Sequence, residues 1–226
     1  MSADPVKKLH AFMKKLPALA EEPAPPYRSS HALDPIVAEL VRSFFVWESG
    51  ERAAERAVKG IESATADYNE LRVCLPHELE QMVGRGDKHL NERSLRLRSV
   101  LNDIYRREHE LTLAHLLTLP KREARAYLEA LDGMPSFVSA RVCLLAIGSH
   151  AVPVDSRVVA ALTKQSSLPS ELQSASHAEC ASWLEHHIRA EDAAALHLRM
   201  ESMLEADCAD TSGRKTSAAK PKAGAR

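Results

Sequence analysis

No segment of this 226-residue chain alternates apolar and polar residues over the length of a β-strand. Apolar residues instead recur three and four positions apart, a spacing that places them on one face of a helix. Aromatic residues make up only 4% of the chain, so the core must be built from Leu, Val, Ile and Ala. Because this composition also favours helix over strand, the sequence predicts an all-α protein of many short helices.

Three parts of the chain differ in composition. Residues 1–25 combine an amphipathic helix, whose apolar positions include Leu9 and Phe12, with the beginning of a proline-rich linker. Residues 26–207 carry the helical periodicity and are predicted to form the folded domain. Residues 208–226 are small and basic without periodicity, a pattern typical of a disordered tail.

The charge is unevenly distributed. The formal net charge is −1, but the segment from Asp210 onward has five basic residues and one acidic residue, or +4, which leaves −1 − 4 = −5 for the rest. Nucleic-acid binding would therefore depend on a local patch, on backbone amides or on the tail. No apolar run reaches the ~18 residues that a membrane span needs. The four cysteines are widely spaced, which predicts reduced thiols in a cytoplasmic protein without a membrane partner.

The segment "LDGMPSFVSARV", residues 131–142, joins two predicted helices through Gly133, Met134 and Pro135. Gly133 can adopt the positive φ that ends a helix, and Pro135 suits the start of the next one. An ordinary turn between two helices explains this pattern. A helix-hairpin-helix is the second interpretation, in which such a turn presents free N–H groups that can hold a phosphate. The turn alone favours the ordinary turn.

The longer stretch "LDGMPSFVSARVCLLAIGSHAVPVDSRV" favours the second interpretation. Gly133 and Asp155 lie 155 − 133 = 22 positions apart, separated by an apolar helix that ends at Gly148 and by an extended "AVPVD". In this spacing the stretch resembles the core of the helix-hairpin-helix-GPD superfamily, the endonuclease III-like DNA glycosylases. A weaker likeness extends over residues 34–164. The resemblance implies a two-lobed all-α bundle that contains a helix-hairpin-helix motif.

The resemblance also implies site residues. Asp155 would be the catalytic carboxylate, stabilising the oxocarbenium-like sugar while the N-glycosidic bond of a flipped base is hydrolysed. Capping of the helix that begins at Ser156 is an alternative role for Asp155, and the two roles are compatible. The residues expected to contact DNA are Gly133, Met134, Pro135, Ser136 and Arg157.

Several positions depart from the family pattern. Phe137 stands where bifunctional members carry a lysine, so no Schiff base can form there and a lyase step by that route is excluded. Pro135 replaces a glycine and removes one backbone donor, which the Ser136 hydroxyl could replace. Phe45 stands where the family has a glutamine; with Trp47 and Phe137 it is a candidate for the base pocket, although core packing is the alternative for these aromatic residues.

No metal or cofactor is predicted. Only Cys180 and Cys208 lie in the region where family members carry four cluster-binding cysteines, so no iron–sulfur cluster is expected. The adjacent pair His186 and His187 points in two directions on a helix and favours surface histidines over a zinc site.

The sequence thus predicts a DNA-binding base-excision repair protein, a monofunctional DNA N-glycosylase acting on double-stranded DNA. We expect a cytoplasmic, nucleoid-associated monomer. Two alternatives remain, a catalytically inactive DNA-binding relative of the glycosylases and a helical protein-interaction module. Both are favoured by the acidic body and by Pro135.

Overall fold

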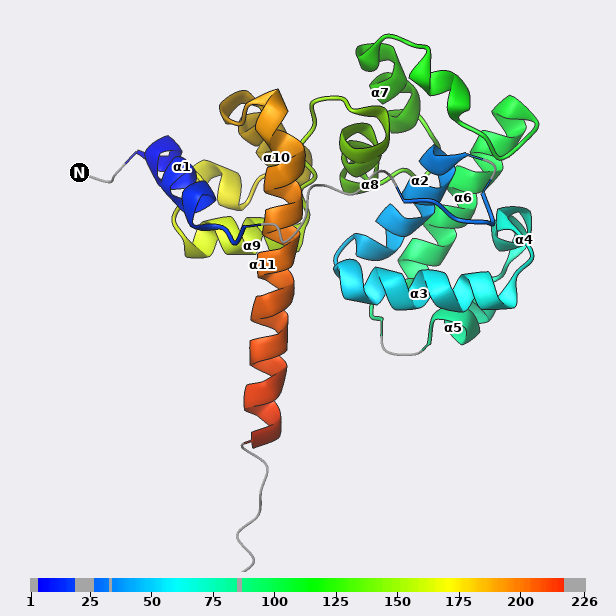
Figure 1. The fold of residues 1–226 in the computed structure, drawn as a ribbon, viewed down its shortest axis with the longest axis horizontal. Helices are drawn as coiled ribbons and strands as arrows, with labels where there is room; N and C mark the ends of the chain where they lie inside the picture. The colour runs from blue at the N-terminus through cyan, green and yellow to red at the C-terminus, as the bar shows by residue number, and fades with distance from the viewer. Residues whose placement is uncertain (1–3, 19–26, 33, 85–86, 218–226) are drawn as a thin grey trace, which may run out of the picture.

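The computed structural model describes residues 4–18, 27–32, 34–84 and 87–217 (Figure 1). These residues form helices and loops and contain no strand, which confirms the predicted all-α class. In the same residues, no helix has both the length and the apolar composition needed to cross a bilayer. The elements are α1 (Pro5–Lys15), α2 (Pro35–Val46), α3 (Glu51–Ala64), α4 (Tyr68–Val73), α5 (Pro76–Val83), α6 (Leu90–Glu108), η1 (Ala114–Leu117), α7 (Lys121–Glu129), α8 (Ser136–Val142), η2 (Cys143–Ile147), α9 (Ser156–Lys164), η3 (Ser170–Gln173), α10 (His177–His187) and α11 (Ala190–Ser217).

Side-chain caps determine where the central helices begin. The Asp34 carboxylate accepts hydrogen bonds from the amides of Ile36 and Val37, and Pro35 occupies the first position of α2. This start agrees with the sequence pattern, since such a cap and proline satisfy helix-terminal donors. Helix α3 has no side-chain cap: it begins after Gly50, at φ +89°, and the hydroxyl of the preceding Ser49 accepts a hydrogen bond from Arg93.

Helix α2 is the centre of the core. Ten of its twelve residues are buried, because α3, α6, α8 and η2 all pack against it. Figure 1 shows α2 to α6 gathered on one side of the molecule, and α1, α9 and α10 around the upper part of α11 on the other. Helices α7 and α8 lie between these two groups in that view.

The predictions for the two ends of the chain have different outcomes. Helix α1 lies within the predicted N-terminal segment and buries Leu9 and Phe12, as its periodicity indicates. The predicted disordered tail from residue 208 is wrong for residues 208–217, because α11 continues through Ser217 and extends past the other helices (Figure 1). Once a helix is nucleated, each added residue gains a hydrogen bond without a new nucleation cost. Residues 218–226 lie outside the described residues.

Candidate nucleic-acid interface

The turn between α7 and α8 is a tight hairpin that requires glycine. Gly133 has φ +83°, and a Cβ atom there would lie 3.1 Å from the Ser99 Cβ and 3.2 Å from the Arg96 carbonyl oxygen. The amide of Met134 donates to the carbonyl of Leu131 at 3.1 Å and closes the turn. Both the positive φ and the close approach to α6 therefore exclude a side chain at position 133.

Three backbone amides of this hairpin have no hydrogen-bond partner in the described part of the protein. Within the described residues, no acceptor pairs with the backbone N–H of Gly133, Ser136 or Phe137. The last two belong to the first turn of α8, where helical geometry provides no partner. Ser136 is exposed, whereas Pro135 is buried and has no N–H to offer. Gly133 is half-buried and Phe137 is buried, so the hairpin presents unpaired donors toward the surface at Gly133 and Ser136, as the sequence predicts for a phosphate contact.

Charged side chains of both signs flank the hairpin. The Arg96 guanidinium lies 3.5 Å from the Gly133 carbonyl oxygen and 5.9 Å from the ring centroid of Trp47. Arg96 therefore connects the hairpin to the end of α2. The Asp132 carboxylate accepts a hydrogen bond of 2.6 Å from the Ser99 hydroxyl and places a negative charge at the turn. An anion on the hairpin would be attracted by Arg96 and repelled by Asp132.

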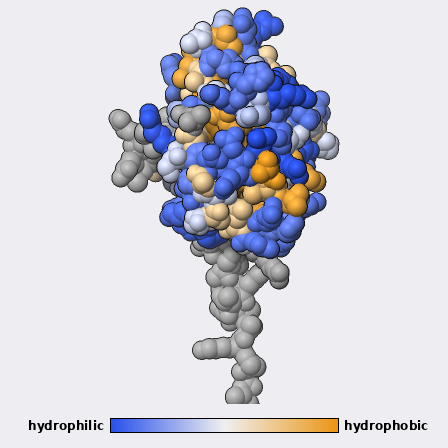
Figure 2. All heavy atoms as spheres, turned by 90° about the vertical axis from the view of Figure 1, so that its right-hand side faces the viewer, coloured by the Kyte–Doolittle hydropathy of each residue, from blue (hydrophilic) through white to orange (hydrophobic). Residues whose placement is uncertain are grey.

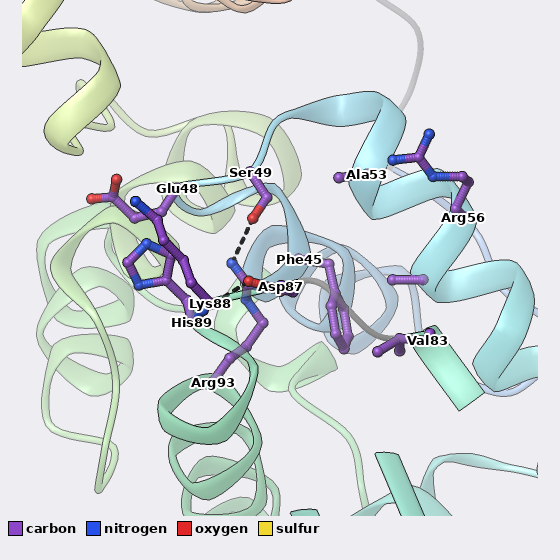
Figure 3. Close-up of a pocket in the computed structure, with 12 residues that line it drawn as sticks. Phe45, Glu48, Ser49, Ala53, Arg56, Val83, Asp87, Lys88, His89 and Arg93 are labelled. Atoms are coloured by element: carbon purple, nitrogen blue, oxygen red, sulfur yellow. Dashed lines mark hydrogen bonds and ion pairs between the residues drawn. The ribbon is translucent and has the colours of Figure 1, made fainter. Parts of the chain in front are cut away.

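A pocket of about 480 Å³ opens where α2, α3 and the start of α6 meet (Figure 3). Phe45 forms part of its wall, and Glu48, Lys88 and His89 lie together at one edge in that view. Arg56 reaches over the opposite edge from α3. The volume is in the range of small-ligand sites. The charged side chains that line it are Arg56, Lys88 and Arg93 against Glu48 and Asp87, a formal sum of +1.

Arg93 is the buried cation of this pocket. Only 1% of its side chain is exposed, and its guanidinium donates to the Trp47 carbonyl and the Ser49 hydroxyl while pairing with Asp87. Burial lowers the pKa of Arg93 to about 10, so the group is still charged at neutral pH. Arg93 is buried because the turn after α2 supplies the acceptors that a buried guanidinium requires.

Asp155 was expected to face a substrate, but in this structure it is buried. The side chain is 0% exposed, and both carboxylate oxygens are occupied by the protein. Oδ1 accepts from the amides of Arg157 and Val158 at 3.1 Å each, and Oδ2 accepts from the amide of Glu48 at 3.0 Å and from Arg157 Nε at 2.8 Å. The sequence pattern identified the helix cap correctly, but a carboxylate with four internal donors faces no ligand.

Arg157 and Phe137 also lie away from the expected positions. The Arg157 guanidinium pairs with Asp155 and with Glu201 of α11. Its donors are therefore engaged inside the protein and do not face a DNA phosphate. Phe137 is 1% exposed and packs edge-on against His197 at 6.3 Å between ring centroids. Both corrections have the same reason: α11 covers this side of α8 and α9 with partners distant in sequence. Phe137 is a core residue, the alternative that the sequence left open.

The two other aromatic candidates lie near the pocket. Phe45 is only 2% exposed, yet its ring forms part of the pocket wall; Trp47 is half-buried beside Arg96. Sequence reasoning missed Glu48, which follows Trp47 directly. Its backbone has φ +60°, a left-handed conformation uncommon for a residue with a side chain. No local sequence signal predicts this conformation, because Asp155 enforces it from another helix.

Among the described residues, no group of three His, Cys, Asp or Glu side chains is arranged to hold a metal ion. No protein-family model matches the chain, and no curated protein is significantly similar to it.

Proposed function

We propose that this protein binds duplex DNA through the hairpin at residues 132–136, as a relative of the helix-hairpin-helix glycosylases in which Asp155 has a structural role. The observation that carries the proposal is the pair of unpaired amides at Gly133 and Ser136 beside Arg96. Backbone donors at the start of a helix suit a phosphate, since the helix dipole adds to their attraction. Such contacts hold the DNA backbone without reading sequence.

The neighbouring pocket supports this proposal. Arg96 connects the hairpin to Trp47, and the Trp47 carbonyl is held by Arg93 of the pocket. The hairpin and the pocket can therefore act on one stretch of nucleic acid. Lys88 and Arg56 are exposed at the pocket and add positive charge where the body is otherwise acidic.

Base excision is the second candidate, and one observation favours it. Glu48 presents a partly exposed carboxylate at the pocket edge, next to the buried Asp155. Its Oε1 accepts from the Ser156 amide at 2.9 Å, and no donor in the described part of the chain pairs with Oε2. A glutamate in that position could stabilise positive charge on a sugar or orient a water. A monofunctional N-glycosylase would then act through Glu48.

Two measurements test these proposals. Fluorescence anisotropy with a labelled duplex measures binding, and a panel of duplexes with damaged or mismatched bases measures excision. DNA binding should weaken as salt increases and should weaken when Gly133 is replaced by alanine. Absence of binding at low salt would leave only a protein-interaction role. Excision that Glu48→Gln abolishes would establish the second candidate, and absence of excision over the panel would remove it.

A further inference from the structure

A second concave surface lies away from the hairpin, where the end of α3 meets α4 and α5. This groove has a volume of about 790 Å³, and its apolar lining includes Val73, Leu75 and Met82. Val73 and Leu75 are 57% and 43% exposed, unusually high for large apolar residues of a core-forming segment. Figure 2 faces this side of the molecule and shows apolar side chains gathered in its lower half among hydrophilic ones.

The same segment is strongly acidic. Residues 62–83 contain five acidic residues and one basic residue. The basic residue, Arg72, is engaged by Asn102 and stacks on Tyr105 at 4.1 Å. Glu70 and Glu78 line the groove and have no opposite charge beside them in its lining. An apolar floor with negative edges repels DNA and attracts a positively charged polypeptide.

The form of the partner follows from the available modes of peptide recognition. Addition of a strand needs a sheet edge, and the described residues contain no sheet. Binding of a polyproline helix needs a groove lined by aromatic side chains, and this lining has none. Insertion of an amphipathic helix into an apolar groove remains. We infer that this groove binds an amphipathic helix of a partner protein, with apolar residues on its buried face and lysines or arginines along its flanks.

The binding test uses a synthetic helical peptide with leucines on one face and lysines on the flanks, and a second peptide in which glutamates replace the lysines. Anisotropy with the full chain should show tighter binding of the lysine peptide. Leu75→Ser should weaken that binding ~10-fold, and Glu70→Gln with Glu78→Gln should weaken it ~5-fold. The glutamine variants keep the hydrogen bonds that these side chains accept from the amides of Ala66 and Leu75.

Matched control variants outside the groove test for non-specific binding of the peptide. Leu117 is 53% exposed on η1, outside the groove, and Glu123 is exposed on α7. Leu117→Ser and Glu123→Gln should leave the affinity unchanged. Equal losses from groove and control variants, or equal binding of both peptides, would overturn the inference.

Cys74 provides a readout that needs no groove variant. It lies in the groove lining and is half-buried, whereas Cys143 and Cys180 are buried. In a Cys208→Ser background, saturating lysine peptide should slow alkylation of Cys74 ~10-fold, as expected for a thiol covered by a docked helix. An unchanged alkylation rate would contradict binding at this groove, whatever the anisotropy shows.

Discussion

The backbone amide of Glu48 donates a hydrogen bond to the Asp155 carboxylate at 3.0 Å, and the Glu48 carboxylate accepts one from the amide of Ser156 at 2.9 Å. The end of α2 and the start of α9 are thus joined by a reciprocal pair of acids. This pair holds Glu48 in its left-handed conformation, φ +60°, which otherwise costs free energy. Asp155 therefore determines how the turn between α2 and α3 faces the pocket.

Replacing Asp155 by alanine should lower the free energy of unfolding by about 3 kcal/mol, because it removes a helix cap and one partner of a buried charge. Urea unfolding measures the change. Asp67 is a matched control: it caps α4 by accepting from two amides but is only half-buried, whereas Asp155 is fully buried. Asp67→Ala should cost only about 1 kcal/mol. Equal losses for the two variants would show that Asp155 is no more than a cap.

Glycine at position 133 should be essential for both the hairpin and DNA binding. Gly133→Ala introduces a methyl group against Ser99 and Arg96 at a positive φ, which we expect to reduce DNA affinity ~10-fold by shifting the amides. Gly148 is the control, since it also has a positive φ, +67°, but nothing within 4 Å of an added Cβ. Gly148→Ala should lose some stability while DNA affinity, measured by anisotropy, stays unchanged.

Removing the negative charge at the hairpin should strengthen DNA binding. Asp132→Asn keeps an acceptor for the Ser99 hydroxyl but removes the repulsion of phosphate, and we expect affinity to rise ~3-fold at low salt. Glu123→Gln, an equal charge change on the exposed surface of α7, controls for net charge. Identical gains from the two variants would mean that DNA does not approach the hairpin.

Stability should fall as the pH rises toward neutrality, because of Glu201. Burial raises the pKa of its carboxyl from 4.5 to about 7, against the lowering effect of Arg157; Asp155 and Glu51 also raise it. The folded state therefore retains a proton that the unfolded state loses, so this contribution is complete below pH 4.5 and is lost as the pH rises through about 7. The full change amounts to about 3 kcal/mol.

Glu201→Gln should flatten the dependence of unfolding free energy on pH over that interval, and urea titrations at several pH values test this. If the unfolding free energy of the variant depends on pH as steeply as that of the wild type, a group other than Glu201 is responsible for the pH dependence.

Periodicity and caps predicted the elements well. The starts of α2 and α9 follow from Asp34 and Asp155, and the inner face of α6 follows from the spacing of Leu97, Val100, Leu101 and Ile104. These features depend on residues within one helical turn, so a single sequence contains the information. The hairpin was predicted for the same reason, since the glycine and proline act locally.

The features that the sequence did not predict depend on contacts between elements that are distant in the chain. Arg157 was expected to reach DNA, but Glu201, 44 residues later, holds it inside the protein. The π-helical segment η2, whose end is closed by the Gly148 amide donating to the Cys143 carbonyl five residues earlier, has no sequence signature either. Long-range pairing of charged side chains determined the candidate site, and periodicity contains no information about such pairing.

An NMR titration of the isotope-labelled protein with duplex DNA tests the central claim most directly. We expect the amide resonances of Gly133 and Ser136 to shift during the titration, because phosphate oxygens would become their acceptors. The amides of Ser156 and Arg157 also begin a helix but are already engaged by Glu48 and Asp155, so they should not shift. Binding of DNA that leaves these two hairpin amides unchanged would contradict the account.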